Sequence, residues 1–208
     1  MPRENFGADH EFLAKEEILS YEEMTKVVAS LLPLGLAKVR ITGGEPLLRR
    51  DLHVFIRLLR NLDPALDIAL TTNGVLLHRH AESLFQSGLS RVTVSLDAVE
   101  EDLFRSITDS KNTPGEIFKG IETAQRIGLP VKVNCVVKNG VNESQIVPLT
   151  KACMEHKIPV RFIEFMDVGT TNNWNLDSVV SGKEMRQILR NHFGPVSYTH
   201  LTLPTTGV

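Results

Sequence analysis

The sequence contains few cysteines, no long apolar run and little net charge. Cys135 and Cys153 are its only cysteines, they fit no metal-ligand spacing, and we expect buried free thiols and no metal site. No segment has the length of a membrane span, and no apolar stretch near Met1 predicts a signal peptide. A net charge of −2 offers nucleic acid or a membrane surface no electrostatic attraction. We therefore expect a cytoplasmic protein that binds neither.

Apolar runs of strand length alternate with helical patterns along the 208 residues, enough for one sizeable core. The expected strands are 38–42, 67–71, 91–95, 131–137 and 160–165. The expected helices are 20–34, 51–61, 77–87, 114–127, 143–156 and 182–193. Capping signatures at Ser20, Thr113 and Ser181 mark three helix starts. Strands separated by helices predict a parallel sheet with right-handed crossovers.

Polar and apolar residues alternate along the expected strands. Arg40 alternates with Val39 and Ile41, and Lys132 alternates with Val131 and Val133. A parallel strand covered by helices on both faces is instead almost continuously apolar. We therefore predict that the apolar face lies under the helices and that the mixed face lines a curved sheet or partial barrel. We expect its polar residues mostly toward the C-terminal ends of the strands, where α/β barrels build their sites.

Arg40 and Lys132 both project into this predicted cavity, and buried cations need an anionic partner. Two interpretations are open at this point. Glu45, Asp97 and Glu164 are available for a structural ion-pair network. Alternatively, the partner is a polyanionic ligand such as a nucleotide phosphate, which suits the point charge of lysine and the fork of arginine.

The segment Thr42-Gly43-Gly44-Glu45-Pro46 closes the first expected strand. A turn from a strand to a helix needs one glycine or asparagine and a cap, whereas this segment has two glycines, an acid and a proline. Glycines at the C-terminal end of a strand allow a ligand to approach the backbone. The Glu45 carboxylate is placed to receive an ammonium group. The C-terminal edge of the sheet is therefore the predicted functional edge.

Five motifs occur together in the order and spacing of one family. They are Thr42-Gly43-Gly44-Glu45-Pro46-Leu47-Leu48-Arg49-Arg50-Asp51-Leu52, Thr71-Thr72-Asn73-Gly74, Val94-Ser95-Leu96-Asp97, Val131-Lys132-Val133-Asn134 and Arg161-Phe162-Ile163-Glu164-Phe165-Met166. Over about residues 1–194 the chain resembles the radical S-adenosylmethionine (radical SAM) family of GTP 3′,8-cyclases. The resemblance implies an α/β fold, a partial (β/α)6 TIM-type barrel. It also implies a lyase that uses SAM and 4Fe-4S clusters to convert GTP to (8S)-3′,8-cyclo-7,8-dihydroguanosine 5′-triphosphate, the first step of molybdenum-cofactor biosynthesis.

The resemblance also implies roles for single residues, and it assigns no catalytic residue. Those expected to contact SAM are Gly43, Gly44, Glu45, Ser95 and Met166. Those expected to face GTP are Arg40, Thr71 and Lys132. Each has a structural alternative: turn glycines, helix-capping hydroxyls, a core methionine and a lysine that reaches the barrel rim.

The chain departs from the family at both ends. Met1-Pro2 matches the Met-Pro that follows the third cysteine of Cys-x-x-x-Cys-x-x-Cys, so we expect the cluster ligands, the first strand and the C-terminal cluster domain to be missing. Residues 196–205 back-translate into a transposon-end adapter, so we expect 195–208 to be an artefactual tail. The remainder, 1–194, is then an incomplete barrel without activity, with an exposed strand edge at 38–42.

Two other interpretations stay open. One is a different radical SAM enzyme, such as a peptide-maturing one, although it would have no reason to carry both Arg40 and Lys132 facing a nucleotide. The other is a cluster-free nucleotide-binding or vestigial protein. The resemblance leaves a homodimer of the complete enzyme open and does not identify an electron donor.

Overall fold

The computed structural model describes residues 18–167 and 175–195. The Met1-Pro2 match and the tail expected at 195–208, apart from Pro195, lie outside the described residues. None of the described helices is long and apolar enough to cross a membrane.

The described residues form one sheet of five parallel strands in the order β1-β2-β3-β4-β5. The strands are β1 Lys38–Ile41, β2 Asp67–Thr72, β3 Arg91–Ser95, β4 Val131–Val137 and β5 Val160–Glu164. The helices are α1 Tyr21–Leu31, α2 Leu52–Leu62, α3 Leu77–Gln86, α4 Glu101–Thr108, α5 Pro114–Arg126, α6 Ile146–Glu155 and α7 Gly182–Phe193. The predicted α/β class, the parallel order and all five strands are confirmed, with strand ends shifted by one residue at most.

Two expected helices have different bounds, and one helix was not predicted. The helix expected over 20–34 is α1 followed by a 3-10 turn at Leu32–Leu34, where Pro33 cannot donate a backbone hydrogen bond. The helix expected over 143–156 likewise begins as a 3-10 turn before α6. Helix α4 was not predicted, because it is only eight residues long, although Leu103, Phe104 and Ile107 form an apolar stripe against the core.

Helix starts follow local side-chain chemistry as predicted. Ser20, Thr113 and Ser181 each accept a hydrogen bond from the backbone of a glutamate three residues later, and that glutamate bonds back to the cap residue. Each reciprocal pair satisfies backbone donors that the first helical turn leaves unpaired.

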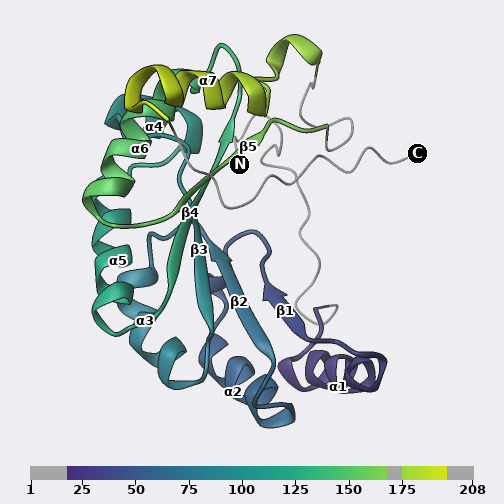
Figure 1. Ribbon diagram of the computed structural model, residues 1–208. Coiled ribbons are helices and arrows are strands. Elements are labelled where there is room, and N and C mark those ends of the chain that lie inside the picture. The colour runs from purple at the N-terminus through teal and green to yellow at the C-terminus, as the bar shows by residue number, and fades with distance from the viewer. Residues whose placement is uncertain (1–17, 168–174, 196–208) are drawn as a thin grey trace, which may run out of the picture.

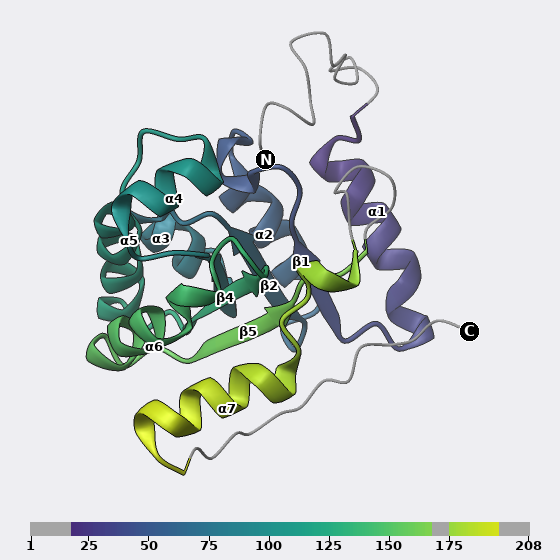
Figure 2. The same cartoon turned by 90° about the horizontal axis from the view of Figure 1, so that it is seen from above.

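Helices α3, α5 and α6 line the convex side of the curved sheet in Figure 1, and the opposite side is concave. Helix α1 packs on α2 near the β1 end, while α7 packs on α6 and β5 at the other end (Figure 2). The core lies between sheet and helices; examples of its members are Ile56, Leu59, Leu70, Val94, Ile121, Val133 and Leu149. Burying each large apolar side chain contributes about 1.5–3 kcal/mol. The apolar face therefore lies under the helices, as predicted.

Both outer strands leave an edge without a strand partner among the described residues. Strand β1 pairs only with β2, and β5 pairs only with β4. The described sheet is therefore open, consistent with part of a TIM-type barrel rather than with a closed one.

Candidate functional site

The strand register brings polar residues from all five strands onto the concave face. Paired positions in neighbouring parallel strands share a face. On β1 and β2, Lys38 pairs with Asp67 and Arg40 with Ala69. On β2 and β3, Ala69 pairs with Arg91 and Thr71 with Thr93. Farther along the sheet, Thr93 pairs with Lys132, Ser95 with Asn134, and Asn134 with Arg161. We call these residues the inner face. The predicted site residues Arg40, Thr71, Ser95 and Lys132 all belong to it.

The inner face gathers five cations: Lys38, Arg40, Arg91, Lys132 and Arg161. Desolvation lowers the pKa of Lys132, and the positive charges of the other four lower it further. The five charges therefore act on one region of space.

Only two of the five cations were singled out from the sequence. Lys38, Arg91 and Arg161 show the same alternation within their strands and could have been found by it. The expectation that polar residues lie mostly toward the C-terminal ends is wrong for the cations, because Lys38 and Arg91 begin their strands. Alternation determines the face of a side chain but not its depth along the barrel.

The carboxylates proposed as internal partners are engaged elsewhere. The Asp97 carboxylate accepts a bond from Val136 N at 2.8 Å, and Glu164 accepts one from Gly182 N at 2.5 Å. Burial raises the pKa of Asp97. No ion pair within the described part of the chain joins Asp97 or Glu164 to an inner-face cation. The ion-pair network with these two acids, the first of the two open interpretations, is therefore not formed within the described residues.

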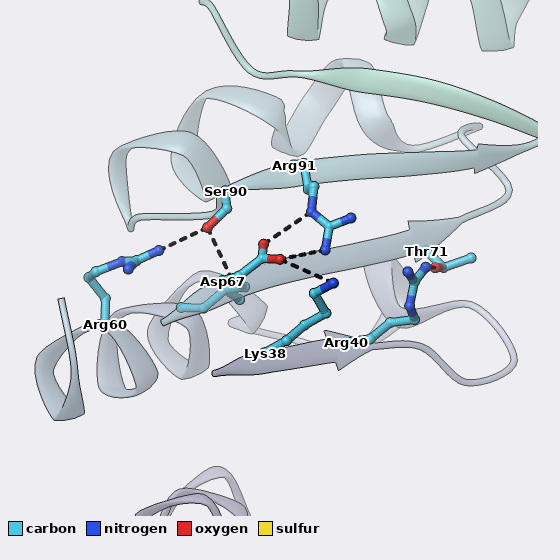
Figure 3. A network of polar contacts seen from close by, with 8 residues as sticks. Lys38, Arg40, Arg60, Asp67, Thr71, Ser90 and Arg91 are labelled. Atoms are coloured by element: carbon cyan, nitrogen blue, oxygen red, sulfur yellow. Dashed lines mark hydrogen bonds and ion pairs between the residues drawn. The ribbon is translucent and has the colours of Figure 1, made fainter. Parts of the chain in front are cut away.

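Asp67 is the carboxylate that the strands do place among the cations. Its Oδ1 accepts Arg91 Nε at 3.0 Å, its Oδ2 accepts Arg91 Nη2 at 2.7 Å, and Lys38 Nζ lies 3.6 Å from Oδ2 (Figure 3). The hydrogen bonds from Arg91 hold the pKa of Asp67 below its usual range. Arg40 Nη1 donates to Thr71 Oγ1 at 3.0 Å, so two of the residues expected to face GTP contact each other.

Two further inner-face atoms have no hydrogen-bond partner among the described residues. They are Thr93 Oγ1, beside Lys132 in the register, and Asn134 Oδ1, between Ser95 and Arg161. A buried polar atom left unpaired costs about 1–3 kcal/mol, so such atoms mark positions where a ligand group would be stabilising. The inner face thus offers both charge and hydrogen-bonding capacity to an anionic polar ligand.

The two glycines after β1 face open space. A Cβ built on Gly43 or Gly44 would meet no atom within 4 Å. Gly43 has φ +154°, a conformation that other residues rarely adopt, but Gly44 has no such constraint. The fold therefore does not require glycine at 44, and the open space beside it leaves its backbone accessible.

Glu45 holds the loop that contains Gly43 and Gly44, here called the glycine loop, against the end of β2. Its Oε1 accepts bonds from Leu47 N at 3.0 Å and Thr72 Oγ1 at 2.7 Å, while Oε2 accepts Asn73 N at 2.8 Å. Most of the acceptor capacity of this carboxylate is thus used inside the protein. The residue expected to receive an ammonium group has a structural task that the sequence did not reveal.

The last two residues expected to contact SAM lie where other strands end. Ser95 is exposed and is the final residue of β3. Met166 follows β5 and is 52% exposed, so it does not fill the core. Together with the glycine loop, these residues lie at the C-terminal ends of β1, β3 and β5, whereas Arg40, Thr71 and Lys132 lie within β1, β2 and β4.

The described residues do not fit an iron–sulfur cluster. Its ligands are thiolates, but Cys135 and Cys153 are buried, and burial raises the pKa of both thiols, that of Cys153 to about 11. Within 18–167 and 175–195, no three or more histidine, cysteine, aspartate or glutamate side chains are grouped to hold a metal. No reaction step through a cluster is derived from these residues.

The fold, the glycine loop and the polar concave sheet define a class of protein. The sequence pattern of the radical SAM superfamily matches residues 6–153, and the chain belongs to this superfamily. More particularly, it is similar to GTP 3′,8-cyclases of Staphylococcus epidermidis and Staphylococcus aureus, at 47% and 46% identity over 193 residues. The match covers 93% of this chain and 57% of each relative, so the chain spans less than two thirds of their length.

Solved structures support the fold. The structure titled "Native anSMEcpe with bound AdoMet" matches 89% of this chain and 54% of that one, at a TM-score of 0.65 and 18% identity. Streptococcus suis SuiB matches 79% of this chain and 38% of that one, at a TM-score of 0.65 and 22% identity. At this identity the likeness concerns the fold alone.

Proposed function

We propose that this chain carries the GTP-binding and SAM-binding core of a GTP 3′,8-cyclase, within residues 1–194. The complete enzyme would convert GTP to (8S)-3′,8-cyclo-7,8-dihydroguanosine 5′-triphosphate in molybdenum-cofactor biosynthesis. The observation that carries the proposal is the cluster of five cations on the inner face, offset by one carboxylate, in a chain 47% identical to such a cyclase.

The inner face suits the triphosphate and ribose of GTP. Arg40 supplies a planar fork and Lys132 a point charge, and both types of donor bind phosphate oxygens. Desolvation, together with the positive charges of the other four cations, lowers the pKa of Lys132 in the free protein, and a bound polyanion would oppose the contribution of those charges. The Thr71 hydroxyl, held by Arg40, would bond the uncharged parts of the ligand, as would the Thr93 and Asn134 oxygens, which have no partner within 18–167 and 175–195.

We assign SAM to the adjoining edge. Gly43 and Gly44 would admit its methionyl end, with Ser95 and Met166 beside it and Glu45 fixing the loop. In the complete enzyme, SAM would supply the radical chemistry, and this chain would supply its binding site. The residues described above would bind and orient SAM and GTP, and none of them is assigned a bond-breaking step.

Calorimetric titration of GTP into the 208-residue chain tests the binding half of the proposal. We expect GTP to bind, and expect Arg40→Gln and Lys132→Gln each to weaken binding about tenfold, since a charge-assisted hydrogen bond contributes about 1.5–3 kcal/mol. Lys26→Gln removes an exposed charge on α1, which packs on α2 and contributes no residue to the inner face as defined above, and serves as the control. Unchanged GTP affinity in both inner-face variants would contradict the assignment.

The chemistry is tested in a chimera in which residues 18–193 replace the matching segment of the S. aureus cyclase. Reconstituted without oxygen, it should consume GTP and release 5′-deoxyadenosine. Lys132→Gln in the chimera should reduce GTP consumption more strongly than release of 5′-deoxyadenosine. Cleavage of SAM without consumption of GTP would instead favour a different radical SAM enzyme.

A cluster-independent nucleotide-binding protein is the second candidate. The observation that favours it is a polar, cationic inner face in described residues that group no cluster ligands. It predicts GTP binding by the 208-residue chain together with neither GTP consumption nor 5′-deoxyadenosine in the chimera.

A further inference from the structure

We propose that Asp67 limits the positive charge of the inner face and so determines how strongly binding depends on the charge of the ligand. Asp67 would be a positioning residue that acts through Arg91 and Lys38 and does not touch the ligand. The inference rests on the proposed function in one respect, namely that the ligand of the inner face carries a phosphate chain.

Asp67 is the first residue of β2 and lies between two cations on neighbouring strands. It receives both Nε and Nη2 of Arg91, at 3.0 and 2.7 Å, in a bidentate pair. Lys38 approaches the same carboxylate from β1 at 3.6 Å (Figure 3). Two nitrogens of the Arg91 guanidinium, Nε and Nη2, are therefore bonded to Asp67. In the described part of the chain, no carboxylate forms an ion pair with Arg40, Lys132 or Arg161.

A second set of contacts fixes the backbone on both sides of this pair. Ser90 Oγ accepts bonds from Ile68 N and Arg60 Nη2, both at 3.0 Å. Arg60 Nη2 also donates to Gly88 O at 2.6 Å. Because Ile68 follows Asp67 and Ser90 precedes Arg91, these contacts hold the two charged residues at a fixed spacing. The side chains of Asp67 and Arg91 are 33% and 25% exposed, so water screens the pair only partly.

The pair has an electrostatic consequence for any anion on the inner face. A carboxylate among the cations repels each negative charge of the ligand, and it also turns Arg91 away from the ligand. Removing it should therefore strengthen binding in proportion to ligand charge. A residue with a merely structural role would alter all ligands alike, or none.

The test compares the 208-residue chain with its Asp67→Asn and Asp67→Glu variants by titration calorimetry. The probes are inorganic orthophosphate, pyrophosphate and tripolyphosphate. Glu101→Gln is the matched control, because it removes the same charge and also breaks an ion pair with an arginine, Arg105, on the exposed surface of α4.

In Asp67→Asn we expect tripolyphosphate to bind about five- to tenfold more tightly, pyrophosphate less so and orthophosphate only about twofold more tightly. This difference should shrink as salt is raised from about 0.05 to about 0.5 M, because screening weakens it. Asp67→Glu retains the charge, so its affinities for the three anions, and their dependence on salt, should match those of the wild type. The same should hold for Glu101→Gln.

Equal affinities of wild type and Asp67→Asn for tripolyphosphate, or an equal gain for all three anions, would overturn the inference and leave the proposed function intact. Absence of tripolyphosphate binding in every variant would overturn both. If Asp67→Asn does not fold, Asp67→Ser replaces it. If neither neutral variant folds while Asp67→Glu does, the Asp67 charge is required for folding. That result would also overturn the inference.

Discussion

Replacing Glu45 with alanine separates a residue that holds a loop from a residue that only binds a ligand. The substitution removes the acceptor for three donors: Leu47 N, Thr72 Oγ1 and Asn73 N. Thr72 is buried, so its hydroxyl cannot turn to water, whereas Asn73 N is more accessible. A donor left unsatisfied costs about 1–3 kcal/mol when buried and less when water reaches it. We therefore expect the ligand-free variant to lose about 2–4 kcal/mol of unfolding free energy.

The assay is denaturant and thermal unfolding of the ligand-free chain. For a chain of 208 residues each kcal/mol corresponds to about 2–4 °C in Tm, so the expected decrease is roughly 5–15 °C. Glu23→Ala is the control, because it also removes a carboxylate that accepts bonds from a serine backbone and hydroxyl, but at an exposed helix start. Its effect on Tm should be clearly smaller.

The opposite result has an equally definite meaning. A carboxylate kept for a ligand gives nothing to the free protein, so its removal would leave Tm unchanged or raise it. An unchanged Tm in Glu45→Ala, together with lost SAM binding, would refute the argument that Glu45 holds the glycine loop against β2.

Three further predictions concern single residues of the site. Gly44→Ala should change the unfolding free energy by less than about 0.5 kcal/mol, since its Cβ meets nothing, yet weaken SAM binding at least tenfold; equal SAM titrations in both proteins would contradict this. Lys132→Met should raise the stability of the ligand-free chain by up to about 1 kcal/mol, because desolvation and four cations oppose its charge, and should weaken GTP binding; lower Tm would contradict it. Asp97→Asn should raise stability at pH 7, because burial raises the folded pKa of Asp97 and thus penalises the ionised form. That penalty applies above the folded pKa and disappears as the pH falls toward about 4, so unfolding curves of the two proteins should converge in acid.

Local signals in the sequence were sufficient for the elements and their faces. The serine and threonine caps gave the starts of α1, α5 and α7, and alternation about Arg40 and Lys132 gave the concave face. Both kinds of signal lie within a few neighbouring residues, so no tertiary information is needed to detect them.

Contacts between strands could not be predicted in the same way. Asp67 and Arg91 meet because of the stagger between β2 and β3, which no spacing along the chain encodes. Glu45 reaches Thr72 for the same reason, across two strand ends. Helix α4 was missed because it has only eight residues, and a helix this short depends on tertiary packing, here of Leu103, Phe104 and Ile107.

The charged inner face also bears on how the chain folds. Side chains repeat every two residues along a strand, so slipping β4 by one residue would turn Lys132 and Asn134 under the helices and Val133 toward the barrel interior. Such a slip would desolvate a lysine among apolar side chains without a partner, which costs several kcal/mol. A fully apolar strand has no comparable penalty and tolerates alternative pairings. The residues assigned to phosphate binding therefore also help to select one strand register while the sheet assembles.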